Sequence, residues 1–423
     1  MLIDEASQQI GAAAAALGSD TFNEDGLRSH IHPLFTRVLA RNEQSQEIYL
    51  ANHSLGRPLD MVQPVIAGAL DQWYERIDGA WEYWLQGRDA YRSQISQLLS
   101  WTAPHCIVPK SSAAQGLRAV INALGSSQPS ILSTRCEFDS IDFVLKAYHH
   151  KGRADVAWLE SDQDGLLDTQ TLLNRIDTQV DLVVLSVVNF VTGQATSHLE
   201  EIVEKAHSCG ACVVLDAYHA FGVLPIDFHT LGADFVIGGN YKYTRGGAGA
   251  CFLAIHPRHT HHSPTIPENN SIFPIDTGWF AKADPFAYKR SDSPEYAAGG
   301  DSWLEATPPV LTYFQALPGL MLSNAIGVDR LRAYSIQQQE FLETQLRARG
   351  VPVRLIENRG AYILIPTPDG HSLAARFKEA GVNTDARPLP SGSDWVVRLC
   401  PDLLNTEAEL TEAASRIASV WHA

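Results

Sequence analysis

An aspartate and a lysine follow two consecutive apolar strand-like runs, and this pairing constrains the fold more than any other feature of the chain. The run Val213–Leu215 leads into Asp216, and the run DFVIGG leads through Asn240 and Tyr241 into Lys242. Ligands in open parallel sheets collect in the crevice outside the carboxyl ends of the strands. We therefore expect Asp216 and Lys242 to face one crevice of an α/β fold.

Lys242 and Asp216 are the two side chains that a pyridoxal 5'-phosphate (PLP) enzyme requires. An amine has to hold the aldehyde of the cofactor, and an anion beside the ring nitrogen has to keep that nitrogen protonated, so that the ring can accept electrons. The alternative for Lys242 is an ordinary solvated side chain, because most lysines are exposed. Among the lysines, it alone follows a strand and precedes a glycine-rich turn, Gly246–Gly249, where backbone can approach a neighbour closely. The pattern predicts a PLP site.

Strand and helix patterns alternate around this segment. Asp181–Val188 reads as a strand, apolar residues then recur at helical spacing until Gly210, and Cys212–Leu215 begins the next strand. Such a βαβ unit builds a parallel sheet with a right-handed crossover. Ser197–Glu200 has the pattern of a capping box at the start of the helix.

The carboxyl-terminal part has a different pattern, with longer helices from about Leu311 and then a βαβ-like tail. Gly360–Ile365 and Trp395–Leu399 are the strand-like runs of this tail. With 423 residues, of which 45% are hydrophobic and 19% charged, the chain can bury a large core. We expect two domains, or one large domain with a smaller one appended.

Charge and cysteine content argue against several classes of protein. A net charge of −16 argues against nucleic acid or an anionic membrane as a partner, since both attract basic surfaces. We expect no secretory signal and no membrane helix, because the basic leader and the long apolar run are lacking. Six cysteines in so long a chain do not suggest a disulfide framework, so a cytoplasmic location is expected. Cys209 and Cys212 form a C-x-x-C, which we interpret as small buried residues at a helix end and a strand start.

The segment Asp216–Tyr243 looks like the cofactor-lysine region of kynureninase, a member of the class V aminotransferase group of fold-type I PLP enzymes. Weaker likenesses to the same family follow in chain order at Tyr49–Pro58, Ser186–Gln194, Gly278–Phe280, Thr307–Pro309, Gly381–Arg387 and Val397–Arg398. Together these matches span about Tyr49 to Asn405.

The resemblance implies an α/β fold-type I PLP-dependent transferase fold, with a large domain around a mostly parallel sheet and a smaller α+β domain. It places residues 66–305 in the large PLP-binding domain and residues 306–423 in the small domain. Residues 1–65 would contribute to the small domain and to a lid over the active site. The resemblance also implies a homodimer with shared active sites and a small-molecule amino acid substrate.

The loop before a predicted amphipathic helix is the candidate phosphate site. Ser111 and Ser112 open this helix, and free backbone N–H groups and the helix dipole favour an anion there. Ordinary capping by serine explains the same pattern equally well. The resemblance favours phosphate binding and adds Tyr241 as a phosphate contact. It further implies that Trp279 and Thr307 reach the phosphate from the second subunit.

The resemblance also assigns groups around the cofactor ring. Phe138 matches the family's stacking aromatic, whose flat face fixes the tilt of the ring. His219 matches a histidine near the cofactor, although an isolated histidine is more often a hydrogen-bonded core residue. Ser186 ends the strand that precedes the aspartate and is placed in the cofactor site. The family has an aspartate three residues after the stacking aromatic; here Ser140 and Asp142 stand on either side of that position, and either could replace it.

Arg398 follows a short apolar strand and resembles the arginine that binds the substrate carboxylate in the family. A guanidinium can hold a carboxylate with two parallel hydrogen bonds and so orient the scissile bond against the ring. The alternative is a surface salt bridge. Ser54 and Gly56, in the amino-terminal element, are expected to close over the same carboxylate.

The resemblance implies hydrolysis of the Cβ–Cγ bond of an L-kynurenine type amino acid, giving an anthranilate-type acid and L-alanine. Lys242 would hold the aldehyde and then move the α-proton, Asp216 would preserve the ring as an electron sink, and Tyr241 is a candidate acid or base for the side-chain step. Two departures leave other substrates open. The segment Trp81–Tyr91 lacks the histidine that kynureninases often carry there, and Thr307 replaces the asparagine of some members.

Other functions compete with this interpretation. A related PLP lyase, cysteine desulfurase, epimerase or aminotransferase is the alternative enzyme. A desulfurase needs a mobile catalytic cysteine, and Cys400 does not have the spacing expected of one. A third hypothesis is a noncatalytic PLP-binding module, but binding alone requires neither Lys242 nor Asp216.

Two residue clusters have structural interpretations. His256, His259, His261 and His262 could bind a metal, but flanking prolines and the lack of a paired acidic or cysteine ligand favour a solvated loop, so no metal is predicted. The aromatic segment Trp73–Tyr91 is expected to serve core packing or dimer contact.

Overall fold

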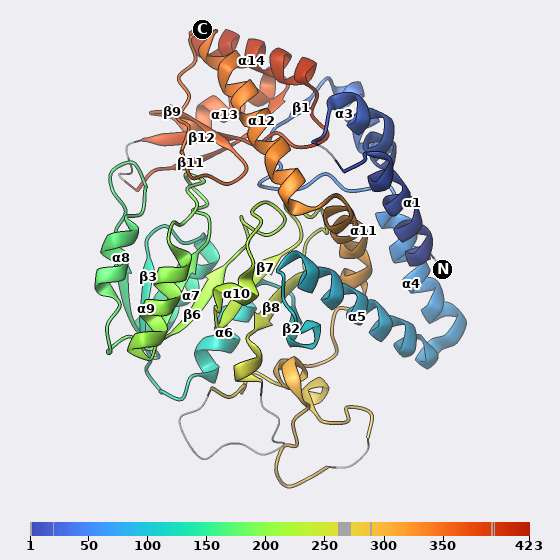
Figure 1. Cartoon of the computed structure of the whole chain (residues 1–423), viewed down its shortest axis with the longest axis vertical. Coiled ribbons are helices and arrows are strands. Elements are labelled where there is room, and N and C mark those ends of the chain that lie inside the picture. Colours follow the sequence, from blue (N-terminus) through green and yellow to red (C-terminus); the bar gives the residue numbers. More distant parts are fainter. Residues whose placement is uncertain (1, 20, 261–271, 288–289, 391, 393) are drawn as a thin grey trace.

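The computed structural model describes the chain except residues 1, 20, 261–271, 288–289, 391 and 393. Its central feature is a seven-stranded sheet with the strand order β2-β8-β7-β6-β5-β3-β4 (Figure 1). These strands are β2 (Ile107–Lys110), β3 (Ser130–Thr134), β4 (Asp155–Leu159), β5 (Leu182–Ser186), β6 (Cys212–Asp216), β7 (Phe235–Gly239) and β8 (Cys251–Ile255). Strands β4, β3, β5, β6 and β7 run parallel, and β8 pairs antiparallel with both β7 and β2. The expected mostly parallel sheet is therefore confirmed.

Alternate residues of the strands face two helical layers. In β6, Val213 and Leu215 join one hydrophobic cluster and Val214 joins the other, as the two-residue period of a strand requires. Helices α6 (Ala113–Ala123) and α7 (Asp139–His150) cover the face that includes Val214. The helices on the opposite face are α5 (Ala80–Leu98), α8 (Thr169–Arg175), α9 (Leu199–Cys209), α10 (Phe228–Leu231) and α11 (Leu311–Ile326).

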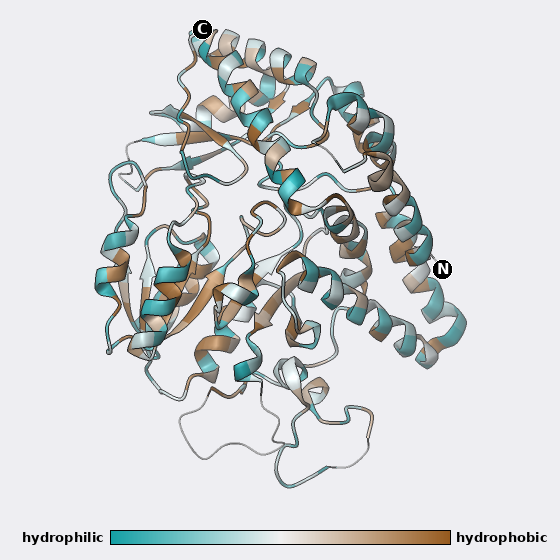
Figure 2. Cartoon of the chain, viewed as in Figure 1, coloured by the Kyte–Doolittle hydropathy of each residue, from teal (hydrophilic) through white to brown (hydrophobic). Residues whose placement is uncertain are grey.

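The covering of both faces is reflected in the hydropathy of the elements. In Figure 2 the strands of this sheet are predominantly apolar, while the surrounding helices carry polar stretches. Strand β5 is buried at every position. A parallel sheet that is covered on both faces needs such continuous apolar strands. Among the described residues, no helix is both long and apolar enough to cross a membrane.

A second, smaller sheet lies at the carboxyl-terminal end of the molecule (Figure 1). It has the order β11-β12-β9 and shares a hydrophobic cluster with the last helices. Its elements are α12 (Val328–Arg347), β9 (Ile363–Thr367), α13 (Gly370–Glu379), β11 (Asp385–Pro388), β12 (Trp395–Leu399) and α14 (Glu407–His422). The expected βαβ-like tail was wrong, because β9 and β12 are antiparallel. The chain returns from α13 through β11, which pairs antiparallel with β12 and reverses the direction.

The amino-terminal segment bridges the two sheets. Strand β1 (Ile48–Tyr49) pairs in parallel with β10 (Val382–Asn383). The same segment contains α1 (Leu2–Ala16), α2 (Glu24–Gly26), α3 (Thr36–Ser45) and α4 (Val62–Arg76). Helices α1 and α4 pack against α11, which also packs on α5. The division of the chain at residues 65 and 305 stays a prediction.

The predicted capping box at Ser197 was wrong. Helix α9 instead has His198 as its N-cap, with a left-handed φ of 57° and no capping hydrogen bond from the side chain. The Ser197 hydroxyl accepts a hydrogen bond from Asn358 Nδ2 at 3.2 Å. A contact with a residue far along the chain therefore replaces the local one.

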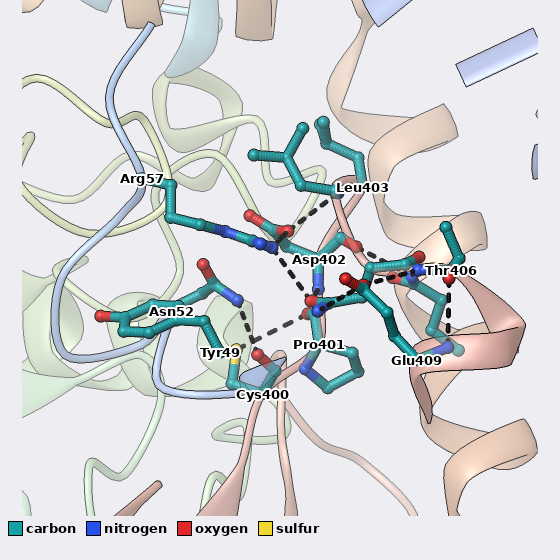
Figure 3. Close-up of polar contacts among 12 residues, drawn as sticks. Tyr49, Asn52, Arg57, Cys400, Pro401, Asp402, Leu403, Thr406 and Glu409 are labelled. Carbon is teal, nitrogen blue, oxygen red and sulfur yellow. Dashed lines mark hydrogen bonds and ion pairs between the residues drawn. The ribbon is translucent and has the colours of Figure 1, made fainter. Parts of the chain in front are cut away.

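A buried charge network ties the amino-terminal segment to the carboxyl-terminal part (Figure 3). Asp402 forms ion pairs with Arg57 and, at 2.6 Å, with Arg245, and Arg57 also donates to Asn405 Oδ1 at 3.0 Å. Burial alone would raise the pKa of Asp402, but the two arginines hold it below its ordinary value. Because Arg245 lies three residues after Lys242, its ion pair with Asp402 ties the loop that carries Lys242 to the carboxyl-terminal part.

Candidate active site

Asp216 and Lys242 lie together at the carboxyl edge of the large sheet. Asp216 is the last residue of β6, and its Oδ1 accepts a hydrogen bond from the Tyr218 N–H at 2.8 Å. Lys242 follows β7, and its Nζ lies 2.6 Å from Nε2 of His219. The other ring nitrogen of His219 lies 3.0 Å from the Tyr243 hydroxyl. The structure therefore brings Asp216, His219 and Lys242 into one cluster.

Burial controls the charge state of this cluster. Desolvation lowers the pKa of Lys242, and the positive charge of Arg398 lowers it further, against the opposing effect of Asp216. Desolvation raises the pKa of Asp216, although the Tyr218 N–H and Lys242 oppose this rise. The pKa of His219 falls well below its usual range for the same reason. The neutral form of a lysine amine attacks an aldehyde, and a lowered pKa increases the fraction of Lys242 in that form.

A pocket of about 180 Å³ opens beside Lys242. Lys242 Nζ lies 5.3 Å from the ring centre of Phe138, 4.9 Å from that of Tyr218 and 5.6 Å from that of Tyr241. The residues predicted for the cofactor that line this pocket are Ser111, Ser112, Phe138, Ser140 and Tyr241. Aromatic walls and hydroxyl groups in a pocket next to a buried amine suit the flat ring and the phosphate of PLP.

The start of α6 forms the hydroxyl-rich end of the pocket. Ser112 is the N-cap, and its hydroxyl accepts a hydrogen bond from the Gln115 N–H at 3.1 Å. Ser111 donates to Gln115 Oε1 from both its backbone N–H and its hydroxyl. The capping interpretation therefore holds for Ser112, and the helix still directs its amino terminus toward the pocket, where an anion is favoured.

The alternatives after Phe138 point in different directions. Ser140 lines the pocket. Asp142 lies one turn before Lys146 on α7 and forms an ion pair with it at 2.5 Å. One oxygen of Asp142 is thus engaged by Lys146, and Ser140 is the residue of the two that lines the pocket.

Ser186 contacts a carboxyl group that the sequence did not reveal. Ser186 is the register partner of Asp216, and its hydroxyl donates to Glu137 Oε2 at 2.5 Å. The other oxygen of Glu137 accepts from the Thr134 hydroxyl at 2.7 Å. Burial raises the pKa of Glu137 to about 7, with a contribution from the negative charge of Asp216. A glutamate in a turn after a strand reads as a surface residue, so only the folded chain reveals this second buried carboxyl group.

Arg398 is buried and forms an ion pair, rather than the surface salt bridge that was the alternative. Its Nη2 lies 2.8 Å from Asp385 Oδ1, and its Nη1 donates to the Phe190 carbonyl. Asp385 also accepts a hydrogen bond from the Ser54 hydroxyl at 2.6 Å, and Arg387 approaches its Oδ1 at 3.1 Å. Arg398 Nε has no partner among the described residues. Two arginines thus share one carboxylate, which leaves a net positive charge beside Lys242.

Gly56 packs directly against the lysine loop. Its N–H donates to the Tyr241 carbonyl at 2.8 Å. A methyl group at Gly56 would lie 1.9 Å from the Lys242 carbonyl oxygen, which is far inside van der Waals contact. Glycine at this position therefore lets the amino-terminal segment set the position of Lys242 through its backbone.

Trp279 and Thr307 lie together but do not line the pocket beside Lys242. The indole Nε1 of Trp279 donates to the Thr307 hydroxyl at 3.2 Å. Trp81 packs edge-on against Trp279, with ring centres 6.4 Å apart. Within one chain, these two residues therefore do not meet the other predicted phosphate contacts.

The histidine-rich segment contributes to a charge cluster at a different place. Its residues 261–262 lie outside the described part of the chain. Ligand atoms of Cys212, Asp234 and His259 lie within 4.8 Å of one another, but Arg258 Nη2 lies 2.8 Å from Asp234 Oδ1 and already supplies a positive charge there. Burial would raise the pKa of Asp234, whereas hydrogen bonds from histidines and the charge of Arg258 lower it to about 2. The contacts are those of a structural ion cluster.

Comparison with known proteins agrees with this architecture. The Aminotransferase class-V family model matches residues 82–360. The kynureninase of Xanthomonas oryzae pv. oryzae (strain KACC10331 / KXO85) is 26% identical over 86% of this chain and 88% of the relative. The kynureninase of Deinococcus radiodurans is 25% identical over 80% of this chain and 82% of the relative.

Solved structures with a similar fold include PLP enzymes. A lysine-to-alanine mutant of C-DES, with glycine covalently linked to its PLP cofactor, superposes with a TM-score of 0.77 and 20% identity, covering 91% of this chain and 98% of that one. The cysteine desulfurase CsdA from Escherichia coli superposes with a TM-score of 0.73 and 18% identity, covering 95% and 99%. At these identities the likeness establishes the fold.

The sheet topology and the Lys242 amine beside the buried carboxylate of Asp216 agree with a PLP-dependent enzyme of fold type I. Because the family model matches well over half of its residues, the chain belongs to the aminotransferase class-V family. Its cofactor is pyridoxal 5'-phosphate.

Replacing Glu137 with glutamine should remove a pH-dependent loss of stability. The folded protein retains the proton of Glu137 up to about pH 7, whereas the unfolded chain releases it near pH 4.3. Raising the pH from about 5 to about 8 should therefore lower the unfolding free energy of the wild type more than that of Glu137→Gln. Urea titrations at both pH values measure this difference, with exposed Glu160→Gln as the control. Equal pH dependence in all three proteins contradicts the assignment.

Replacing Gly56 with alanine should displace the lysine loop and reduce PLP binding. The added methyl group collides with backbone at Lys242, which cannot move as a side chain tip can. Gly11→Ala is a matched control, because a methyl group there meets no atom within 4 Å. We expect the purified Gly56→Ala protein to contain less bound PLP than the wild type, measured by absorbance after denaturation. Full cofactor content in Gly56→Ala would show that this contact does not position Lys242.

Proposed function

We propose that the protein is a kynureninase-like hydrolase that cleaves the Cβ–Cγ bond of an L-kynurenine type amino acid, giving an anthranilate-type acid and L-alanine. The observation that supports this proposal most directly is the single cluster of Lys242, Asp216 and Arg398 beside an aromatic pocket. The likeness to kynureninases over most of the chain supports the same reaction.

Lys242 is proposed to hold the cofactor aldehyde through Nζ. When bound, PLP supplies an electron sink that stabilises negative charge at the α-carbon of the substrate. Asp216 would keep the ring nitrogen protonated, since a buried carboxylate, held here by the Tyr218 N–H, favours a nearby cation. Lys242 would also carry the α-proton of the substrate, and His219, whose Nε2 lies 2.6 Å from Nζ, would orient the amine.

Arg398 is proposed to bind the substrate carboxylate. Asp385 and the Phe190 carbonyl hold two nitrogens of the guanidinium, and Nε has no partner in the described part of the chain. Asp385 therefore orients the arginine, and Ser54 in turn orients Asp385. In this proposal Ser54 acts through Asp385, which differs from the direct carboxylate contact expected from the sequence.

Tyr241 is the proposed proton donor for the side-chain step. It lines the pocket, and burial raises its pKa, so the phenol keeps its proton at neutral pH. Water adds to the side-chain ketone, and the Cβ–Cγ bond breaks with its electron pair on Cβ. The ketone carbon leaves as a carboxylic acid, and a proton delivered to Cβ completes the methyl group of alanine.

A desulfurase is the alternative enzyme with the same fold, and the cysteines disfavour it. Cys106, Cys136, Cys251 and Cys400 are buried. Cys400 follows Arg398 but is 1% exposed, and burial raises the pKa of its thiol far above the usual value. The two partly exposed cysteines lie at the end of α9 and the start of β6, at the opposite edge of the sheet from Lys242.

Product analysis tests the hydrolase. Purified holoenzyme given L-kynurenine or 3-hydroxykynurenine should release L-alanine and the matching anthranilate, and Lys242→Ala should lose both the products and the absorbance band of the lysine-bound cofactor. Sulfide release from L-cysteine, measured in parallel, identifies a desulfurase instead. Untouched kynurenines with an intact cofactor band would refute the hydrolase while leaving the PLP site in place.

We further propose that two copies of the chain assemble and complete each other's sites. An apolar hollow lined by Trp73, Ile77, Trp81 and Thr307 opens beside Trp279. Trp73 is 54% exposed and Ile77 65%, and burial of such a patch against a second copy removes it from water. Sedimentation equilibrium should give twice the chain mass, and Trp73→Glu should shift it toward the monomer. A monomeric wild type at micromolar concentration would exclude the shared site.

A further inference from the structure

His53 is a buried histidine whose ring has no hydrogen-bond partner in the described structure. The residue is 1% exposed, and neither Nδ1 nor Nε2 contacts a protein donor or acceptor among the described residues. Buried polar atoms are almost always paired, and an unpaired one calls for an explanation such as a ligand contact. The position of His53 indicates which ligand.

Tyr362 lies between His53 and the charged residues of the candidate active site. The rings of His53 and Tyr362 are 4.9 Å apart. The guanidinium of Arg398 lies 5.5 Å from the same ring centre, and the ring of His219 lies 5.9 Å from it. His219 in turn contacts Lys242. His53, Arg398 and the lysine cluster therefore surround one buried tyrosine.

Tyr362 itself does not satisfy His53. Its hydroxyl donates to the carbonyls of Asn189 and Phe190. Asn52, the residue before His53, directs its amide to the Cys400 carbonyl at 2.8 Å (Figure 3). The neighbouring polar groups thus have partners of their own.

The charges that face His53 are positive. Burial lowers the pKa of His53 well below its usual range, and Arg398, Lys242 and Arg387 lower it further. The ring is therefore neutral, with one N–H donor and one acceptor nitrogen. The cations near His53 attract the substrate carboxylate more strongly than a neutral imidazole does. The imidazole N–H is therefore free to bind a different oxygen of the substrate.

We propose that His53 binds the substrate by donating a hydrogen bond to a carbonyl oxygen on the substrate side chain. This inference rests on the proposed function, in which the α-amino group joins the cofactor in place of Lys242 and Arg398 takes the carboxylate. The side-chain carbonyl is the remaining polar group near the α-carbon, and the imidazole N–H of His53 is a donor at this site that no acceptor among the described residues takes. As water adds to this carbonyl, its oxygen gains negative charge, and a placed donor stabilises that charge.

The expected ligand class follows from this contact. An α-amino acid with a carbonyl at Cγ, such as L-kynurenine or L-asparagine, can accept the bond from His53. L-Alanine has the same amino and carboxylate groups but no such oxygen. His53 is therefore expected to separate amino acids by the side chain rather than by the groups that all amino acids share.

Binding titrations of the holoenzyme test this inference. Dissociation constants for L-kynurenine, L-asparagine and L-alanine are read from the change in the cofactor absorbance band, in wild type, His53→Phe and His53→Gln. Loss of one hydrogen bond should weaken kynurenine and asparagine binding about 10-fold in His53→Phe, leave alanine unchanged, and be partly restored in His53→Gln. His229→Phe, at the opposite edge of the sheet beside His256, is the control and should match the wild type.

Two results would overturn the inference. Equal weakening for all three amino acids would place His53 on the shared part of the substrate or in the fold, and unchanged binding for all three would remove it from the site. A wild type that binds kynurenine without releasing alanine refutes the hydrolase alone. The ratio of binding constants then still decides the role of His53.

Discussion

The chemistry of this protein depends on the register of a parallel sheet. Because β5, β6 and β7 run in the same direction, their carboxyl ends meet at one edge, and Ser186 and Asp216 are direct register partners there. The chain leaves β7 and reaches Lys242 within three residues of Gly239. An amine and a carboxylate are thereby held together away from water, where neither is fully stable in its charged form.

The burial of Lys242 and Asp216 also determines how the other groups of the site interact with them. Desolvation makes the lysine amine reactive, and the same dry environment makes Asp216 dependent on a cationic partner. Glu137 adds a second buried carboxyl group behind the first one. Arg398 and Arg387 come from the smaller sheet, and both form ion pairs with Asp385. The larger sheet thus contributes Asp216 and Lys242 and the smaller sheet contributes Arg398, Arg387 and Asp385, so charged groups from both sheets meet at one site.

Features encoded by local periodicity were predictable from the sequence. The βαβ unit that ends in Asp216 was read from strand length and helical spacing, and the comparisons confirm the fold class, the class-V family and PLP as the cofactor. The pocket places Ser112, Phe138 and Tyr241 beside Lys242, although their roles stay predictions, as do the domain limits and the dimer.

Features that depend on distant pairings were not predictable. The tail is not a βαβ unit because β11 lies between α13 and β12 in the chain, so that β12 runs antiparallel to both β11 and β9. Ser197 does not cap α9, because its hydroxyl accepts a hydrogen bond from Asn358, which lies far along the chain. His53 and Glu137 have no local pattern that separates them from surface residues, since their significance comes from burial among residues of other elements.

The contact between Gly56 and the lysine loop has a consequence for the length of chain that the site requires. The strand before Gly56 pairs with β10, which lies far along the chain. A chain that ended before β10 would keep every strand of the large sheet and would lose the partner of the strand that leads to Gly56. Truncation at the carboxyl-terminal side would therefore be expected to reach Lys242 through the amino-terminal segment.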